Sequence, residues 1–153
     1  MNIFDVHIKN GEVIDGTGAP KFKSDIVIDK GKIIGVFPAE NGDVRDPSEN
    51  HFLSNFKAKH TINAENKIIS PGFIDVHTHD DDNVFLDPSM SSKISQGVTT
   101  CVAGNCGISL APFSYKGEVP APIALLGKSE VFRFPRVSDY KEEFNNKPSS
   151  VNL

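Results

Sequence analysis

The feature that most restricts the fold is a strand–helix–strand pattern in the middle of the chain. Residues 68–79 read as one strand-like segment, and residues 98–102 are β-branched almost throughout. Between them, Asp87 followed by Pro88 is typical of a helix start, and Gly97 is typical of a helix end. Two strands joined by a helix form a βαβ unit, whose strands are parallel. The sequence therefore predicts an α/β fold.

The segment that follows extends this pattern. A second helix is expected to begin near Ser138 and to end by Pro148, and residues 149–153 read as the opening of a third strand. A parallel sheet of two or three strands without further crossovers cannot cover both of its faces. We therefore expect this chain to be the beginning of a larger protein.

The N-terminal segment predicts two short hairpins. Apolar and polar residues alternate on both sides of Asn10–Gly11, a pair that favours a two-residue turn. That turn would set Lys9 opposite Glu12. The second hairpin would turn at Lys30–Gly31 in the same way.

The next segment changes character. Residues 38–60 contain turn-forming residues without an apolar period, which indicates an irregular excursion at the surface. A short strand is expected over residues 61–64, followed by a turn at Glu65–Asn66 and a further strand from Lys67.

Composition excludes several classes of protein. The chain has 153 residues and a net charge of −4, whereas proteins held to nucleic acid or to an anionic membrane by phosphate contacts are normally basic. The N-terminus lacks a basic segment followed by an apolar run, and no apolar stretch approaches the roughly 18–20 residues of a membrane helix. We therefore expect a cytoplasmic protein that binds neither nucleic acid nor membranes.

His77 and His79 give the sharpest chemical signal. Residues two apart on a strand project from the same face, so both imidazoles can converge on one metal ion, zinc above all. They also follow an apolar strand, and α/β proteins build their sites at the carboxyl ends of such strands. The alternative is an ordinary pair of surface histidines. Asp75 either orients His77 or bonds to nearby backbone.

Cys106 lies between two glycines at the end of the second predicted strand. It is a candidate thiolate ligand, and the alternative is a small buried apolar residue. Cys101 is expected to pack inside the sheet, and two cysteines are too few for a disulfide scaffold.

The remaining histidines and an acidic run are not interpreted as metal ligands in the first instance. We expect the three histidines to be solvated or structural; they are His7, His51 and His60. The run Asp80–Asp82 is interpreted as a hydrated loop, with the alternative that one carboxylate lies near the metal.

Residues 69–79, ISPGFIDVHTH, resemble the signature strand of the amidohydrolase superfamily. Residues 104–112, GNCGISLAP, resemble the N-acyl-D-amino-acid deacylase branch, the D-aminoacylases, and Asn105–Cys106–Gly107 is the more specific motif. Further stretches similar to that branch lie at residues 13–20, 94–100, 132–134 and 138–140.

This resemblance implies an incomplete (β/α)₈ TIM barrel of the amidohydrolase type, preceded by N-terminal strands of a small β-sandwich. The sandwich part would be residues 1–67, and the first βα units of the barrel would be residues 68–153. His77, His79 and Cys106 would be zinc ligands. The reaction would be hydrolysis of an N-acyl-D-amino acid, a small-molecule substrate, to a carboxylate and a free D-amino acid.

The resemblance also implies that the site is incomplete in this chain. The general base, an aspartate, and two further histidines of the family lie on later barrel strands, so no catalytic residue is expected within residues 1–153. A barrel takes about 250 residues. We therefore expect the isolated chain to show little or no deacylase activity and to bind zinc weakly.

Two other interpretations remain open. One is another hydrolase of the same superfamily, similar to dihydroorotases or hydantoinases, although those relatives usually lack the cysteine of Asn105–Cys106–Gly107. The other is a non-catalytic remnant that keeps the fold without the chemistry.

Overall fold

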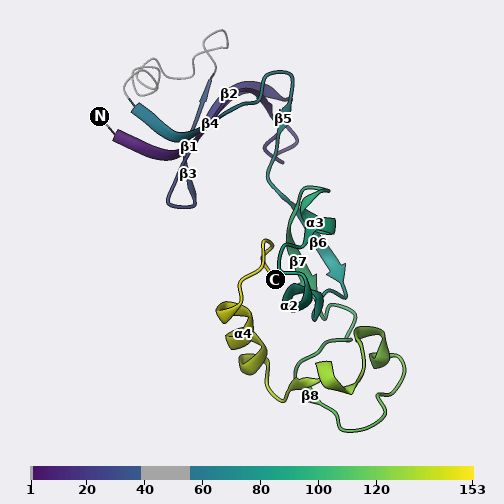
Figure 1. Ribbon diagram of the computed structural model, residues 1–153. Coiled ribbons are helices and arrows are strands. Elements are labelled where there is room, and N and C mark those ends of the chain that lie inside the picture. Colours follow the sequence, from purple (N-terminus) through teal and green to yellow (C-terminus); the bar gives the residue numbers. More distant parts are fainter. Residues whose placement is uncertain (1, 39–55) are drawn as a thin grey trace. The chain divides into compact units, whose positions relative to one another are not determined.

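The computed structural model describes residues 2–38 and 56–153, which belong to two compact units, Met1–Pro71 and Gly72–Leu153 (Figure 1). Each unit has its own sheet structure and its own buried side chains. No helix among the described residues is long and apolar enough to cross a membrane.

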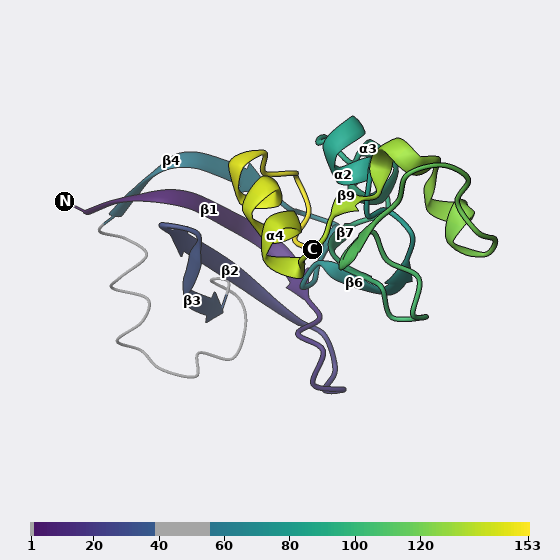
Figure 2. The same cartoon turned by 90° about the horizontal axis from the view of Figure 1, so that it is seen from below.

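The first unit is a mixed sheet built around its first strand. The strands are β1 (Asn2–Val13), β2 (Phe22–Asp29), β3 (Lys32–Pro38), β4 (Phe56–Asn63) and β5 (Ile68–Ile69). Their order is β3-β2-β1-β4, and β5 also pairs with β1. β1 is antiparallel to β2 but parallel to β4 and β5. Figure 2 shows β1 running alongside β4.

The second predicted hairpin is confirmed and the first is wrong. Lys30 and Gly31 both have positive φ and join β2 to β3, with Asp29 opposite Lys32. Asn10–Gly11, in contrast, lies inside β1, so Lys9 does not face Glu12.

Asn10 forms a bulge where a turn was expected. Its φ is 65°, and the register of β1 against β2 shifts between Ile8 and Gly11. Its backbone N–H donates to Asp25 Oδ1 at 3.0 Å. Gly11 lies close to Ile69, since a Cβ there would lie 2.3 Å from Cδ1 of that side chain, which would have to shift.

The strand expected over residues 61–64 begins earlier, at Phe56, inside the predicted excursion 38–60. Residues 39–55 of that excursion lie outside the described residues. The turn at Glu65–Asn66 is confirmed, with Asn66 at φ 59° and Lys67 N–H donating to Ala64 O at 2.9 Å.

The second unit contains the predicted parallel pair. Its elements are β6 (Phe73–Thr78), α2 (Asn83–Leu86), α3 (Ser91–Ile94), β7 (Val98–Ala103), β8 (Phe113–Ser114), η1 (Ile123–Leu126), η2 (Ser129–Val131), β9 (Arg133–Phe134) and α4 (Val137–Asn146). β6 and β7 are parallel, as predicted, whereas β8 and β9 are antiparallel. The described residues therefore show a mixed sheet structure with few helices, and no closed barrel.

The single strand predicted over residues 68–79 is two strands. β5 ends at Ile69 and pairs in the first unit, and β6 begins at Phe73 in the second unit. Pro71 has no N–H to donate to a ladder, which accounts for a break at this point.

The helix predicted after Asp87 is present but shorter, because α3 begins only at Ser91. Asp87 Oδ1 accepts the N–H of Ser89 at 3.2 Å, and Met90 has φ 47°, so this segment is a turn. Met90 is fully buried against Val84, Cys101 and Val151, and its burial outweighs the local preference for helix. The predicted end is confirmed, because Gly97 has φ 80° and donates to Ile94 O.

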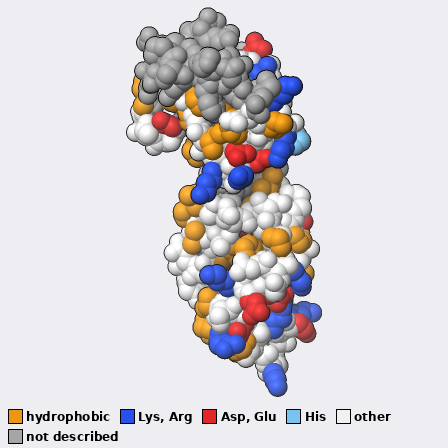
Figure 3. Space-filling view, turned by 90° about the vertical axis from the view of Figure 1, so that its left-hand side faces the viewer, with side chains coloured by type: hydrophobic (Ala, Val, Ile, Leu, Met, Phe, Trp, Pro, Cys, Tyr) orange, Lys and Arg blue, Asp and Glu red, His pale blue; other side chains and the backbone are white. Residues whose placement is uncertain are grey.

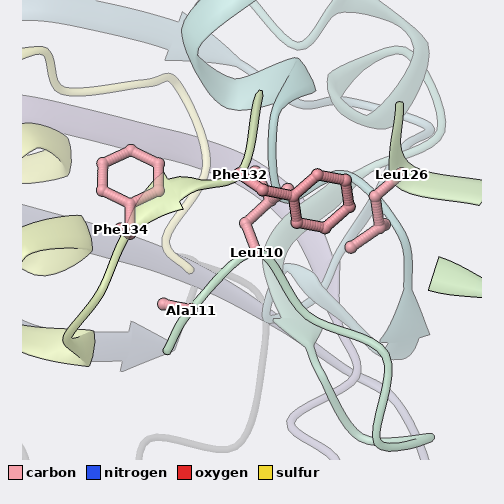
Figure 4. Close-up of a cluster of buried hydrophobic side chains, with 5 residues drawn as sticks. All are labelled: Leu110, Ala111, Leu126, Phe132 and Phe134. Carbon is pink, nitrogen blue, oxygen red and sulfur yellow. The ribbon is translucent and has the colours of Figure 1, made fainter. Parts of the chain in front are cut away.

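Most of the buried apolar side chains of the second unit belong to a cluster around Phe132, which is 1% exposed. Figure 4 shows the Phe132 ring between Leu110 and Leu126. α4 is the predicted second helix, and its Tyr140 packs against this cluster. The residues expected to open a third strand make one parallel bridge, Thr100 to Asn152.

β6 carries apolar side chains that other described residues leave uncovered. Phe73, Ile74 and Val76 are 59%, 61% and 61% exposed. On the face shown in Figure 3, apolar side chains are interspersed with charged ones.

Candidate metal centre

The structure brings His77, His79 and Cys106 together. One donor atom from each lies within 4.8 Å of the other two. Cys106 Sγ is 3.9 Å from His79 Nε2, and the two imidazole centroids are 5.5 Å apart with an interplanar angle of 65°. All three side chains are exposed, so the open side of the cluster can accept a further ligand.

Two short segments present these donors. His77 lies in β6 and His79 follows its end, while Thr78 between them is buried. Cys106 lies in a turn closed by the N–H of Gly107, which donates to Gly104 O at 2.9 Å. Both glycines have positive φ, which permits this tight path after β7.

The donor set fits a zinc ion. Two imidazole nitrogens and one thiolate are ligands that zinc prefers, and catalytic zinc sites use three protein ligands and leave one position open. Zn–N and Zn–S distances of about 2.1 and 2.3 Å place tetrahedral ligands roughly 3.3–3.6 Å apart. The observed 3.9 Å between Sγ and Nε2 is slightly wider than a closed tetrahedral shell.

Lys93 forms ion pairs with two carboxylates, Asp75 and Asp80. Lys93 Nζ lies 2.6 Å from Asp75 Oδ2 and 3.0 Å from Asp80 Oδ2. The hydrogen bond from Lys93 lowers the pKa of Asp75, and the same bond raises the pKa of Lys93. Burial raises the pKa of Asp80, but hydrogen bonds from Thr78 and Lys93 outweigh it and leave that pKa lowered. Both carboxylates are therefore held in their charged form.

The interpretation of Asp80–Asp82 as a hydrated loop is wrong. Asp81 and Asp82 are 1% and 8% exposed. Asp81 Oδ1 accepts the N–H of Leu110 at 3.2 Å, and within the described residues the buried Oδ2 has no hydrogen-bond partner. Burial raises the pKa of Asp81.

Asp75 follows the second of its two interpretations. Its Oδ1 accepts the backbone N–H of His77 at 3.2 Å, rather than a ring N–H. The residues that sequence reasoning missed around the cluster are Lys93 and the side chain of Asn105, which donates to Val76 O at 2.8 Å. No local sequence pattern predicts these contacts, because each joins residues far apart in the chain.

The other candidates lie elsewhere. His7 bonds to Asp25 at 2.7 Å in the first sheet, and His60 is an exposed residue of β4, which agrees with structural or solvated roles. His51 lies outside the described residues. Cys101 is 1% exposed and packs in the second unit, as expected.

Sequence comparison finds deacylases that are similar to this chain. The chain is 38% identical over 150 residues to a D-aminoacylase of Alcaligenes xylosoxydans xylosoxydans, covering 97% of this chain and 28% of that enzyme. It is also 38% identical over 149 residues to an N-acyl-D-aspartate deacylase of the same organism, covering 97% of this chain and 27% of that enzyme. This chain therefore spans little more than a quarter of the length of these relatives.

Solved structures agree. A D-aminoacylase studied for its binuclear metal centre superposes with a TM-score of 0.81 at 44% identity, covering 97% of this chain and 28% of that one. An N-acyl-D-glutamate deacylase from Bordetella bronchiseptica, complexed with zinc and a phosphonate inhibitor, gives a TM-score of 0.81 at 37% identity over 99% of this chain and 28% of that one. The family model of the amidohydrolase family matches residues 60–146. The chain belongs to the amidohydrolase family.

Proposed function

We propose that this chain supplies part of the metal centre of a zinc-dependent amidohydrolase that cleaves N-acyl-D-amino acids to a carboxylate and a free D-amino acid. The observation that carries the proposal is the convergence of the donor atoms of His77, His79 and Cys106 within 4.8 Å. The substrate class rests on the relatives, which are D-aminoacylase and N-acyl-D-aspartate deacylase.

The three donors would hold the zinc of this centre. Bound zinc polarises an amide carbonyl and lowers the pKa of its water ligand to about 7. The exposed side of the cluster leaves room for that water and for the substrate carbonyl. Lys93 keeps Asp75 and Asp80 charged beside the centre without presenting them as ligands.

We further propose that the second unit, Gly72–Leu153, contributes the first βα units of a (β/α)₈ barrel and that the first unit, Met1–Pro71, contributes strands of a small β-sandwich. The boundary lies later than the 67/68 expected from the sequence, because β5 pairs with β1. The exposed apolar side chains on β6 support the barrel, because both faces of a parallel sheet are normally covered. The family's general base would then come from barrel strands outside residues 1–153, and the isolated chain would show little or no deacylase activity.

A hydantoinase- or dihydroorotase-like activity is the alternative within the superfamily. Cys106 favours the deacylase branch, because its thiol is 3.9 Å from His79 Nε2 and is placed to serve as a ligand. The same placement argues against a remnant without chemistry.

The metal centre is tested by titrating the 153-residue chain with Co²⁺. A thiolate ligand gives a charge-transfer band in the near ultraviolet. We expect this band in the native chain and its loss in Cys106→Ala. Cys101→Ala is the matched control and should keep the band, because Cys101 is buried away from the donors. A native chain without the band would overturn the metal centre.

The reaction is tested with a chimera in which residues 1–153 replace the matched segment of the Alcaligenes D-aminoacylase. We expect the chimera to release D-amino acids from N-acyl-D-amino acids but not to act on the L-enantiomers, and the same chimera with Cys106→Ala to be inactive. A folded, zinc-loaded chimera that hydrolyses only cyclic amides would favour the alternative.

A further inference from the structure

β6 contains a β-bulge beside the candidate ligands. In the β6–β7 ladder Asp75 pairs with Cys101, and the next pair is Thr78 with Ala103. Three steps along β6 therefore match two along β7, which leaves one extra residue at Val76–His77. Bulges disrupt the ladder locally and re-aim a side chain.

The peptide group at this bulge is held from both ends by side chains. Its carbonyl, on Val76, accepts a hydrogen bond from Asn105 Nδ2 at 2.8 Å. Its N–H, on His77, donates to Asp75 Oδ1 at 3.2 Å. Asp75 is itself fixed by Lys93, whose Nζ lies 2.6 Å from Oδ2. Two side chains therefore bind both polar groups of this peptide.

Asn105 connects the two segments that carry the metal donors. It directly precedes Cys106 in the turn Gly104–Gly107, and the carbonyl that it binds directly precedes His77. One hydrogen bond thus joins the backbone next to the thiol to the backbone next to an imidazole. Cys106 Sγ also approaches His79 Nε2 to 3.9 Å, which is a second contact between the two segments.

From this geometry we infer that Asn105 is a positioning residue of the metal centre, which fixes the Cys106 thiol relative to the imidazoles by clamping the Val76–His77 peptide. The inference rests on the metal centre proposed above and deepens it. In this role Asn105 acts through the Val76–His77 peptide and not as a metal ligand. Its contribution is to hold a strand carrying one ligand against a turn carrying another, so that less rearrangement accompanies metal binding.

The structure supplies a matched comparison for this role. Asn152 Nδ2 donates to Thr99 O at 3.1 Å, which is also an exposed amide bound to a strand carbonyl of the second unit. Asn152 does not adjoin any of the three donors. Substitutions of Asn105 and Asn152 therefore remove similar bonds, and only the first lies between metal-ligand segments.

The test compares Asn105→Asp with Asn152→Asp in the 153-residue chain. Aspartate keeps the size of the side chain and removes the N–H donor. Zinc affinity is measured by competition with a chromophoric chelator, and the thiolate-to-cobalt band is recorded at saturating Co²⁺. We expect Asn105→Asp to weaken zinc binding by about 10- to 100-fold and to shift or weaken the band, with Asn152→Asp unchanged in both.

Asn105→Ala is the second variant, because it removes the donor without placing a carboxylate beside the Val76 carbonyl. It should show the same loss, with far-ultraviolet circular dichroism like that of the native chain. Equal zinc affinities and identical cobalt spectra in the Asn105 and Asn152 variants would overturn the positioning role and leave the metal centre standing. A native chain that binds neither ion would instead overturn the metal centre itself.

Discussion

In the first unit β1 is hydrogen-bonded along most of its length to β2 on one side and β4 on the other, so repeated ladder bonds fix its path. In the second unit, single bonds from side chains to backbone also hold segments around the candidate metal centre. Asn105 binds Val76 O, Asp81 binds the N–H of Leu110, and the Tyr140 hydroxyl donates to Asp81 O at 2.6 Å.

This difference has a physical consequence. A ladder distributes stability over many equivalent bonds, so the loss of one is shared by its neighbours. A loop held by one buried side chain loses its position when that side chain changes. Single substitutions are therefore expected to act strongly and locally in the second unit and weakly in the first.

The largest effect is expected from Phe132→Ala. Removing this fully buried ring leaves a cavity, and the second unit should lose about 3–5 kcal/mol of its free energy of unfolding. Hydrogen exchange measured residue by residue should show lower protection in β7 and α4 and unchanged protection in β1 and β2. Phe73→Ala is the control, because Phe73 is 59% exposed. Equal loss of protection in both units would contradict the expectation that the substitution acts only in the second unit.

A smaller effect is expected at Asp81. Asp81→Ala leaves the Leu110 N–H without its acceptor, whereas Asp81→Asn keeps an acceptor oxygen there and carries no charge. The alanine variant should be less stable than the asparagine variant by about 1–3 kcal/mol in urea unfolding. Because burial raises the pKa of Asp81, its ionised form opposes folding, and Asp81→Asn should match or exceed the native stability at neutral pH. If the asparagine variant is as unstable as the alanine variant, the hydrogen bond from the Leu110 N–H does not stabilise the fold.

Acid should weaken the second unit through Glu143. The hydrogen bond from Arg133, with Nη2 at 2.9 Å, holds the pKa of Glu143 below its usual value. The pair therefore stabilises the fold fully above the unfolded pKa of about 4.3, and the contribution disappears as pH falls through the lower folded pKa. Native chain and Glu143→Gln should differ by up to about 1 kcal/mol at neutral pH and should converge in urea unfolding at about pH 2.

The same contrast separates what the sequence could predict from what it could not. The Lys30–Gly31 turn and its register follow from neighbouring residues, and the structure confirms both. The dipeptide Asn10–Gly11 carries a stronger turn signal, because asparagine tolerates positive φ better than lysine, and yet it lies within a strand. Its conformation depends on β2 and on Ile69, which contacts Gly11 from a distant part of the chain.

At the candidate site, the sequence supplied His77, His79 and Cys106 as candidate donors, and the family resemblance, rather than spacing alone, predicted that they converge. The groups that hold them were not predictable. The buried Asp81 accepts the N–H of Leu110, and Lys93 reaches Asp75 from α3, which begins later than the sequence predicts. Each of these contacts joins segments that only the tertiary fold brings together. Local conformational propensity therefore cannot predict them.

The smallest predicted effect lies in the first unit, at the turn that the sequence located correctly. Lys30 has φ 50°, a left-handed conformation that costs an ordinary residue roughly 1–2 kcal/mol and costs asparagine less. Lys30→Asn should therefore raise the free energy of unfolding by about 0.5 kcal/mol. The gain is smaller than the full cost of the left-handed conformation, because the variant loses the attraction between the Lys30 charge and Asp5. Asn66 has φ 59° in another turn of the same unit, so Asn66→Lys should lower stability by a similar amount. Urea unfolding should show opposite changes of this size in the two variants, and their zinc affinity should not change. That result would support the view that substitutions in the first unit act weakly and do not reach the metal centre. A loss of zinc affinity in either variant would contradict it.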